Sequence, residues 1–304
     1  MQSFEHTPPE ARELLARPIR DGELAAKGLA RFRPGVYLSD EWACPDKEPV
    51  IGVPFYLADP KIAELERVVN DLEDEREILM YLRHEAGHAF NYAYQLYEAK
   101  EWLDLFGPFD RPYPDDYKPV PFSRKYVRHI AGWYAQKHPD EDFAETFAVW
   151  LTPDSDWQRR YAGWPALRKL KYVERVAREL AEVHPRKALE VAVRELPVEE
   201  MRDTIEQYYR EHEREQEVVF GDVPDSELED IFVRRGEDLR SAAAFLIEHR
   251  KIIVDKITYW TGVRRAVIRK LLEAIARRAR ELEVVAFATT LAMNYLTRGG
   301  FTER

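Results

Sequence analysis

Two histidines separated by one helical turn constrain this chain more than any other feature. They lie in the segment H-E-A-G-H, residues 84–88, within a stretch from about Asp74 to Tyr97 whose residue spacing predicts a helix. Because positions i and i+4 share one face of a helix, His84 and His88 can bind a single metal ion, with Glu85 directed at the water that the metal activates. The competing interpretation is a pair of solvent-exposed histidines on a helix.

The metal hypothesis needs a third ligand, since a catalytic zinc ion usually has three protein ligands and one open position. A second helix is predicted to begin after Pro139, with Asp140 as its N-cap, and it carries two glutamates four residues apart. One glutamate can bind the metal while the other hydrogen-bonds a ligating histidine. From the residues alone, both Glu141 and Glu145 remain candidates for the third ligand.

The single cysteine, Cys44, excludes an internal disulfide and a cysteine-based zinc site, so any metal must be bound by histidine and carboxylate. Cys44 has no base nearby in the sequence, and we interpret it as a structural residue. One thiol and an N-terminal segment without the apolar core of a signal peptide favour the cytoplasm. The longest apolar stretch, Val284–Leu296, is shorter than the roughly 20 residues that cross a bilayer, so we expect a buried helix and no membrane partner.

The formal net charge of −10 argues against nucleic acid as the main partner of the whole chain. A basic amphipathic helix predicted over Thr258–Glu281 is the local exception. It can belong to a helix-turn-helix-like module or an anionic docking surface, or it can be a bundle helix whose charged face is solvated or paired with glutamates. We favour the bundle helix, so nucleic acid is not an expected partner.

The order of patterns along the chain predicts an α+β fold that is mainly α. Short runs of Val, Ile, Tyr and Phe over Arg31–Asp59 predict a few strands, and helices follow from Pro60. The proline-rich segment Phe106–Ser123 predicts a long surface loop of the kind that often shapes a cleft. From about His184 the chain is highly charged and almost wholly helical. We therefore expect a first domain with a small sheet, residues 1–183, and an all-helical accessory domain, residues 184–304.

The two predicted helices together resemble a known class of enzymes. H-E-A-G-H, followed about fifty residues later by E-D-F-A-E-T-F-A-V-W-L, is similar to the gluzincin peptidases, and within them to the family named "putative zinc-binding metallopeptidase". The similarity extends from about Tyr37 to Glu174 and includes Y-L-S-D-E-W, P-F-Y-L-A-D-P and R-Y-A-G-W-P-A-L-R-K-L. This resemblance implies a zincin-like catalytic domain with one catalytic Zn²⁺. It does not cover the C-terminal region.

The second helix also resembles its counterpart in anthrax lethal factor, a gluzincin in which the first glutamate of E-x-x-A-E binds zinc and a tyrosine seven residues earlier faces the substrate carbonyl. This resemblance implies that Glu141 is the third ligand and that Glu145 supports a ligating histidine. It also implies that Tyr134 donates a hydrogen bond to the oxyanion. His138 and His129 are the alternative donors, and we interpret both as polar surface residues.

Residues and resemblance together predict a zinc metallopeptidase that hydrolyses peptide bonds of a protein or peptide substrate. In this mechanism Glu85 takes a proton from the attacking water and passes it to the leaving amine. One alternative is a zinc exopeptidase or amide hydrolase of carboxypeptidase type, and another is a non-catalytic interaction module stabilised by zinc. A general base at Glu85 argues against the module, because a structural zinc site has no use for one. No residue pattern indicates an oligomeric state.

Overall fold

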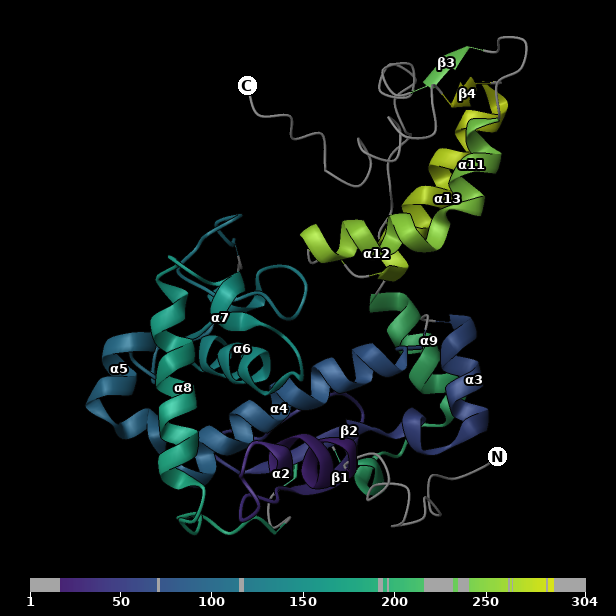
Figure 1. The fold of residues 1–304 in the computed structure, drawn as a ribbon. Coiled ribbons are helices and arrows are strands. Elements are labelled where there is room, and N and C mark those ends of the chain that lie inside the picture. The colour runs from purple at the N-terminus through teal and green to yellow at the C-terminus, as the bar shows by residue number, and fades with distance from the viewer. Residues whose placement is uncertain are drawn as a thin grey trace. The chain divides into compact units, whose positions relative to one another are not determined.

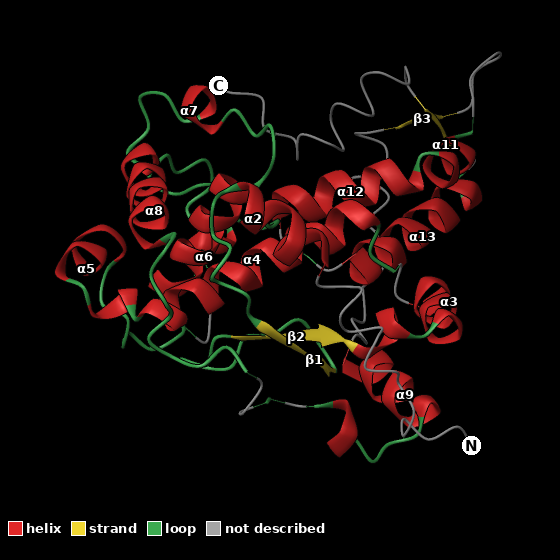
Figure 2. Cartoon of the chain, turned by 60° about the horizontal axis from the view of Figure 1, so that its bottom comes forward, coloured by secondary structure: helices red, strands yellow, loops and turns green. Residues whose placement is uncertain are grey.

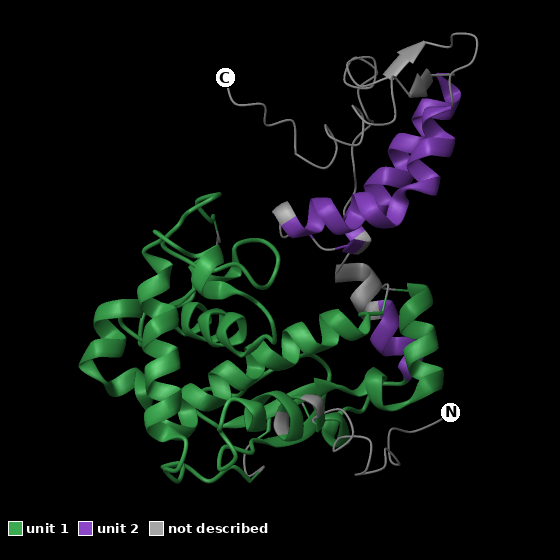
Figure 3. Cartoon of the chain, viewed as in Figure 1, with its two compact units in different colours: residues 1–204 green, residues 205–304 purple. Residues whose placement is uncertain are grey.

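The computed structural model describes residues 17–69, 72–114, 118–190, 194–195, 197–215, 232–234, 241–261, 263, 265–282 and 284–286. The chain divides into two compact units, residues 1–204 and residues 205–304, and each has its own hydrophobic core (Figure 3). The described elements of the first unit are, in order, η2 (Pro18–Glu23), α2 (Leu24–Ala26), β1 (Gly35–Ser39), β2 (Val50–Pro54), η3 (Phe55–Ala58), α3 (Pro60–Val69), α4 (Glu75–Tyr94), η4 (Leu96–Glu98), α5 (Lys100–Phe106), η5 (Tyr134–Gln136), α6 (Pro139–Leu151), α7 (Trp157–Arg160), α8 (Ala166–Leu180) and η6 (Val198–Glu200) (Figure 1).

The sheet of the first unit consists of two short parallel strands alongside α4 (Figure 2). Strand β1 pairs with β2 in a register that runs from Gly35 opposite Val50 to Ser39 opposite Pro54. Every residue of β2 is buried, which fits its run of Val and Ile, since strands covered on both faces lack polar alternation. The connection folds back on β2 through an antiparallel bridge between Ala43 and Gly52.

Helix α4 begins and ends at recognisable capping residues. Asp74 and Glu77 form a capping box, in which each side chain accepts a hydrogen bond from the other residue's backbone N–H. The helix ends at Gln95, whose φ of 55° is left-handed and directs the chain into the short helix η4. The predicted helix over Asp74–Tyr97 is therefore present, with its last residues in a separate 3₁₀ turn.

The backbones of helices α4 and α6 come very close together where the helices cross. A Cβ atom built on Gly87 would lie 2.8 Å from both the Cα and the carbonyl oxygen of Ala144, so the two backbones almost touch at this point. Gly87 is the fourth residue of the H-E-A-G-H segment and directly precedes His88. The glycine therefore allows the second helix to approach the face that carries the two histidines.

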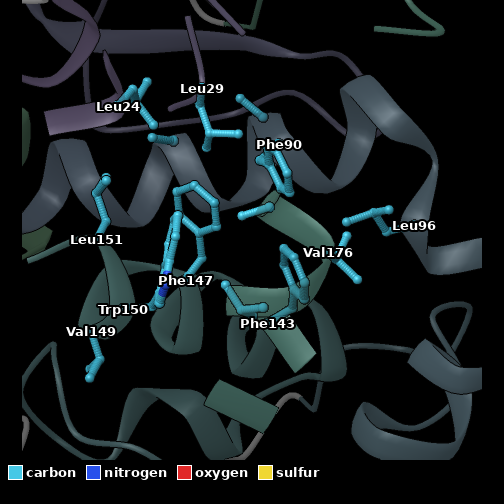
Figure 4. Packing of buried hydrophobic residues seen from close by; sticks show 14 of the residues in the cluster. Leu24, Leu29, Phe90, Leu96, Phe143, Phe147, Val149, Trp150, Leu151 and Val176 are labelled. Carbon is cyan, nitrogen blue, oxygen red and sulfur yellow. The ribbon is translucent and has the colours of Figure 1, made fainter. Parts of the chain in front are cut away.

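Aromatic side chains fill the space beside this crossing. The ring of Phe90 on α4 stacks on Phe147 of α6 with centroids 5.0 Å apart, and Phe143 lies next to them (Figure 4). Leu24 and Leu29 from the N-terminal segment cover the same cluster, and both are fully buried. Helix α8 packs on α6, and a buried ion pair between Lys169 and Asp142 joins the two helices. Burial of this large apolar cluster is the main force that holds α4 and α6 together.

Residues 184–204 belong to the first unit rather than the second. Gly35 N donates to the carbonyl of Leu189 (2.8 Å), and the Tyr37 hydroxyl hydrogen-bonds both the backbone N–H and the carbonyl of Glu195. Ser39 forms an antiparallel bridge with Pro197. This segment therefore lies along the free edge of β1, while a boundary of independent folding at 183/184 stays a prediction.

The described part of the second unit is mainly helical and includes one short pair of strands. Its described elements are α9 (Ile205–Glu215), β3 (Phe232–Arg234), α11 (Ala242–Glu248), α12 (Arg250–Thr261), α13 (Arg265–Glu281) and β4 (Val284–Ala286). Strands β3 and β4 pair antiparallel, a feature that the expected all-helical domain lacks. The basic stretch Thr258–Glu281 is divided between α12 and α13, and an ion pair between Arg265 and Asp255 joins these helices.

The apolar stretch from Val284 does not begin as a helix, because Val284–Ala286 forms β4; the rest of that stretch lies outside the described residues. No described helix combines the length and the apolar character that a membrane crossing requires. The predicted class, α+β and mainly α with a small sheet, is confirmed.

Candidate metal centre

Three buried side chains converge where α4 crosses the first turn of α6. His84 and His88 come from α4 and Glu141 from α6, and each is at most 7% exposed. Oε2 of Glu141 lies 3.0 Å from His84 Nε2 and 3.2 Å from His88 Nε2, and the two Nε2 atoms are 3.1 Å apart. The three atoms form a nearly equilateral triangle of possible metal ligands.

The other nitrogen of each imidazole faces a carboxylate. His84 Nδ1 lies 2.9 Å from Glu145 Oε1, and His88 Nδ1 lies 2.7 Å from Asp140 Oδ2. An ionised carboxylate only accepts hydrogen bonds, so each Nδ1 carries a proton, and loss of the proton on Nε2 would leave a lone pair there. Two Nε2 atoms and one carboxylate oxygen thus face one another inside the protein, an arrangement that needs protons or a metal cation between them.

The chemistry of this donor set fits zinc. Bonds of about 2.0–2.1 Å to a tetrahedral ion place neighbouring ligand atoms roughly 3.3 Å apart, close to the observed triangle.

The pKa shifts of His84 and Glu141 also indicate a site that favours positive charge. Burial alone would lower the pKa of His84, but hydrogen bonds with Glu141 and Glu145 outweigh it and raise that pKa to about 9. Burial would raise the pKa of Glu141, and the two histidines instead hold it well below its usual value. The cluster therefore attracts positive charge.

Asp140 has a different place from the one predicted. The N-cap of α6 is His138, whose Nδ1 accepts a hydrogen bond from the backbone N–H of Asp140. The Asp140 carboxylate instead accepts hydrogen bonds from His88 (2.7 Å), Asn91 (2.8 Å) and Tyr92 (2.5 Å). The only sequence signal for this role is that Asn91 and Tyr92 follow His88 by three and four residues and so share its helix face.

Glu145 supports the centre from the opposite side. Its side chain is fully buried, with Oε1 on His84 Nδ1 and Oε2 accepting backbone hydrogen bonds from His129 (3.2 Å) and Ile130 (2.9 Å). Since Glu145 meets the Nδ1 side of His84, its carboxylate does not join the triangle of Nε2 and Oε2 atoms. The geometry thus separates the two glutamates that sequence spacing alone left equivalent.

Glu85 lies beside the triangle with its carboxylate uncommitted. The residue is 7% exposed, and no hydrogen bond joins its side chain to any described residue. Burial raises its pKa against the opposing influence of His84 and His88. A carboxylate with a raised pKa and no structural partner is suited to accept and release a proton.

Besides Tyr92, the tyrosines Tyr113 and Tyr134 approach the centre, and only Tyr134 was predicted. Tyr134, at the start of η5, has its ring centroid 5.5 Å from that of His84, and burial together with Glu141 raises its pKa, so the phenol stays protonated. Tyr113 comes from the proline-rich loop and donates a hydrogen bond to Glu141 Oε1 (3.1 Å). Its ring stacks on His138 with centroids 4.0 Å apart. No periodic pattern marks Tyr113, because a loop residue is placed only by the folded chain.

The two alternative histidines make structural contacts. His138 Nε2 donates to the carbonyl of Arg111 (2.6 Å) while its Nδ1 caps α6, and His129 Nε2 donates to the carbonyl of Met80 (2.9 Å). His138 is buried rather than a surface residue, which corrects the sequence-based interpretation. Cys44 donates its thiol to the carbonyl of Glu48 (3.2 Å), and burial raises its pKa well above the usual value.

Comparison with known proteins supports a metal-binding peptidase domain. Residues 47–159 match the family model described as "Putative zinc-binding metallo-peptidase". The matched segment contains the whole cluster described above, from His84 to Glu145. The predicted resemblance to this family is confirmed over those residues. Neither a curated protein nor a solved structure matches the chain.

Proposed function

We propose that the chain is a zinc peptidase in which His84, His88 and Glu141 bind one Zn²⁺ ion. The observation that carries this proposal is the convergence of three lone-pair atoms within 3.2 Å of one another, with both imidazoles oriented by buried carboxylates. The matching family model supports it. When bound, zinc would polarise the substrate carbonyl and lower the pKa of a water molecule.

Each neighbouring residue has a chemical task in this proposal. Glu85 accepts the proton of the attacking water and transfers it to the leaving nitrogen, for which its raised pKa suits it. Tyr134 keeps its proton and donates a hydrogen bond to the oxyanion that forms from the peptide carbonyl. Asp140 and Glu145 hold the two imidazoles with Nε2 towards the ion.

The substrate class follows from the reaction. A site of this kind acts on peptide bonds of proteins or peptides, and the same residues would also serve an exopeptidase or an amide hydrolase. A purely structural zinc site is less consistent with the geometry, because it would not need the uncommitted carboxylate of Glu85 beside the metal. The single thiol, Cys44, supports a reducing compartment such as the cytoplasm.

Zinc content of four proteins tests the proposal: the wild type, His88→Ala, Glu141→Ala and Glu85→Gln. We expect wild type and Glu85→Gln to bind one zinc ion each, while both alanine variants lose it, since each removes one of three ligands. Glu85→Gln should also abolish peptide hydrolysis without loss of zinc. If Glu141→Ala retains zinc as tightly as wild type, the third ligand is a different residue, and if wild type binds no zinc, the peptidase proposal is wrong.

A further inference from the structure

A lysine lies between two tyrosine rings at the edge of the candidate metal centre. Lys137 Nζ donates a hydrogen bond to the hydroxyl of Tyr134 (3.3 Å) and lies 4.9 Å from the centre of that ring. The same nitrogen is 5.5 Å from the centre of the Tyr113 ring. Aromatic rings attract cations to their faces, so these contacts hold the ammonium group in one place.

Both tyrosines connect this ammonium group to the metal centre. Tyr113 donates to Oε1 of Glu141, and the Tyr134 ring packs on the ring of His84. Lys137 is thus one side chain away from two of the three candidate ligands. A group bound to Lys137 would therefore lie close to a peptide bond that is positioned for cleavage.

The positive charge of Lys137 is not neutralised by the described part of the chain. No described carboxylate lies within ion-pair distance of its Nζ. Three carboxylates of the centre have other partners: Glu141 faces the imidazoles, and Asp140 and Glu145 bind the histidine Nδ1 atoms. Glu85 has no such partner, and no ion pair joins it to Lys137. Lys137 can therefore accept an external anion.

Two other cations of the first unit, Arg83 and Lys169, differ in this respect. Arg83 binds Glu23 through two hydrogen bonds of 2.7 and 2.6 Å, and Lys169 is paired with Asp142. Both pairs join separate elements of the fold, as expected when charges are buried, because an unpaired buried charge is costly. Lys137 makes no such link, which favours a role in binding rather than in folding.

We infer that Lys137 binds a carboxylate of the substrate next to the scissile bond and so determines specificity. This inference rests on the peptidase function proposed above. The carboxylate of a C-terminal residue is about 2.5 Å from that residue's own nitrogen, the leaving atom when the last peptide bond is cut. An acidic side chain beside the bond offers the same chemistry. The substrate class is thus a peptide with a terminal or side-chain carboxylate at this position.

Matched peptides with and without the carboxylate test this inference on the zinc-loaded full-length protein. One pair has the same N-blocked sequences with a free or an amidated C-terminus, and a second, fully amidated pair contains Glu or Gln at the varied position. We expect the carboxylate-bearing member of one pair to have a roughly 10- to 100-fold higher kcat/KM, mainly through KM, since an ion-paired hydrogen bond is worth this much. The pair that shows the difference identifies the source of the carboxylate.

Lys137→Gln should remove this preference, while Lys137→Arg should keep part of it. Lys171→Gln is the control, because Lys171 is exposed on α8. If Lys137→Gln lowers cleavage of both members of a pair equally, or if wild type shows no preference, the inference is wrong although the peptidase function stands.

Binding of the same peptides to zinc-loaded Glu85→Gln, measured by calorimetry, separates the two proposals further. Carboxylate-dependent binding that Lys137→Gln abolishes would support the inference even without turnover. If wild type cleaves no peptide and Glu85→Gln binds none, both the inference and the proposed function are wrong.

Discussion

Single residues decide which atoms of the centre would face a bound metal ion. Asp140 and Glu145 are buried carboxylates, a costly arrangement unless hydrogen bonds compensate for lost water. Asp140 accepts from three side chains, and Glu145 accepts from one imidazole and two backbone N–H groups. These bonds determine the tautomer of each histidine. The centre is therefore preorganised by protein contacts alone.

The hydrogen bond from Tyr113 to Glu141 leads to a prediction for a single residue. Its hydroxyl binds the oxygen of Glu141 that points away from the histidines, and so it orients the carboxylate with Oε2 towards them. Tyr113→Phe keeps the ring on His138 but removes this hydrogen bond. We expect zinc affinity to fall roughly 10- to 100-fold, measured by competition with a chromophoric chelator.

Tyr97→Phe is the matched control for this prediction. Tyr97 stacks on Phe109 and has no contact with the three candidate ligands, so its variant should bind zinc as wild type does. Equal affinity of Tyr113→Phe and wild type would show that Glu141 needs no support from the loop.

Whole elements meet at the centre because α4 and α6 touch along their backbones. Helix α4 carries His84, Glu85 and His88, and α6 carries Asp140, Glu141 and Glu145. A small shift between the two helices would therefore change every distance between a histidine and a carboxylate of the centre. The stacked rings of Phe90 and Phe147 fill the neighbouring space, and the pair of Lys169 with Asp142 holds α8 against α6. The helix crossing is thus part of the site.

Gly87→Ala tests this dependence on the crossing. The new methyl group would lie 2.8 Å from backbone atoms of Ala144, which cannot move without moving α6. Alanine gains about 1 kcal/mol in helix propensity, but overpacking typically costs about 1–3 kcal/mol, and the helix shift should also weaken zinc binding. We expect a lower free energy of unfolding in urea and lower zinc affinity.

Gly22→Ala serves as the control, because nothing lies within 4 Å of the Cβ position at Gly22. That variant should be as stable as wild type or slightly more stable. An unchanged unfolding midpoint for Gly87→Ala would mean that the two helices separate at little cost.

At the scale of the whole molecule, residues 184–204 complete the first unit, although they follow its last long helix, α8. Arg186 N donates to the carbonyl of Ala93 at the end of α4, and Gly35 N donates to the carbonyl of Leu189 at the start of β1. Tyr37, on the same strand, then binds the carbonyl of Glu195. The segment therefore connects α4 to the sheet.

Two fragments test where the first unit ends. Residues 1–204 should unfold cooperatively and bind zinc as the full chain does, because all these contacts are retained. Residues 1–183 should melt at a lower temperature, since the buried Tyr37 hydroxyl and the edge of β1 lose their partners. Circular dichroism and zinc titration of both fragments provide the measurement. Equal melting temperatures would instead support a boundary at 183/184.

Local patterns in the sequence were sufficient for the helices and for the set of candidate ligands. Helical spacing predicted α4, and Pro139 marked the start of α6, because these signals act over a few neighbouring residues. Spacing also placed His84 and His88 on one face. The choice of Glu141 over Glu145 came from a resemblance, since two glutamates one turn apart are equivalent in spacing alone.

Tertiary structure decided the parts of the centre that depend on contacts between distant segments. Asp140 meets His88 from 52 residues away, and Tyr113 reaches Glu141 from a loop that follows no period. Lys137 Nζ contacts the rings of Tyr113 and Tyr134 only because the folded chain brings both tyrosines to it. Such contacts depend on how the helices cross and where a loop returns. The sequence by itself therefore determined the chemistry that is present, and only the folded chain determined which groups hold and surround it.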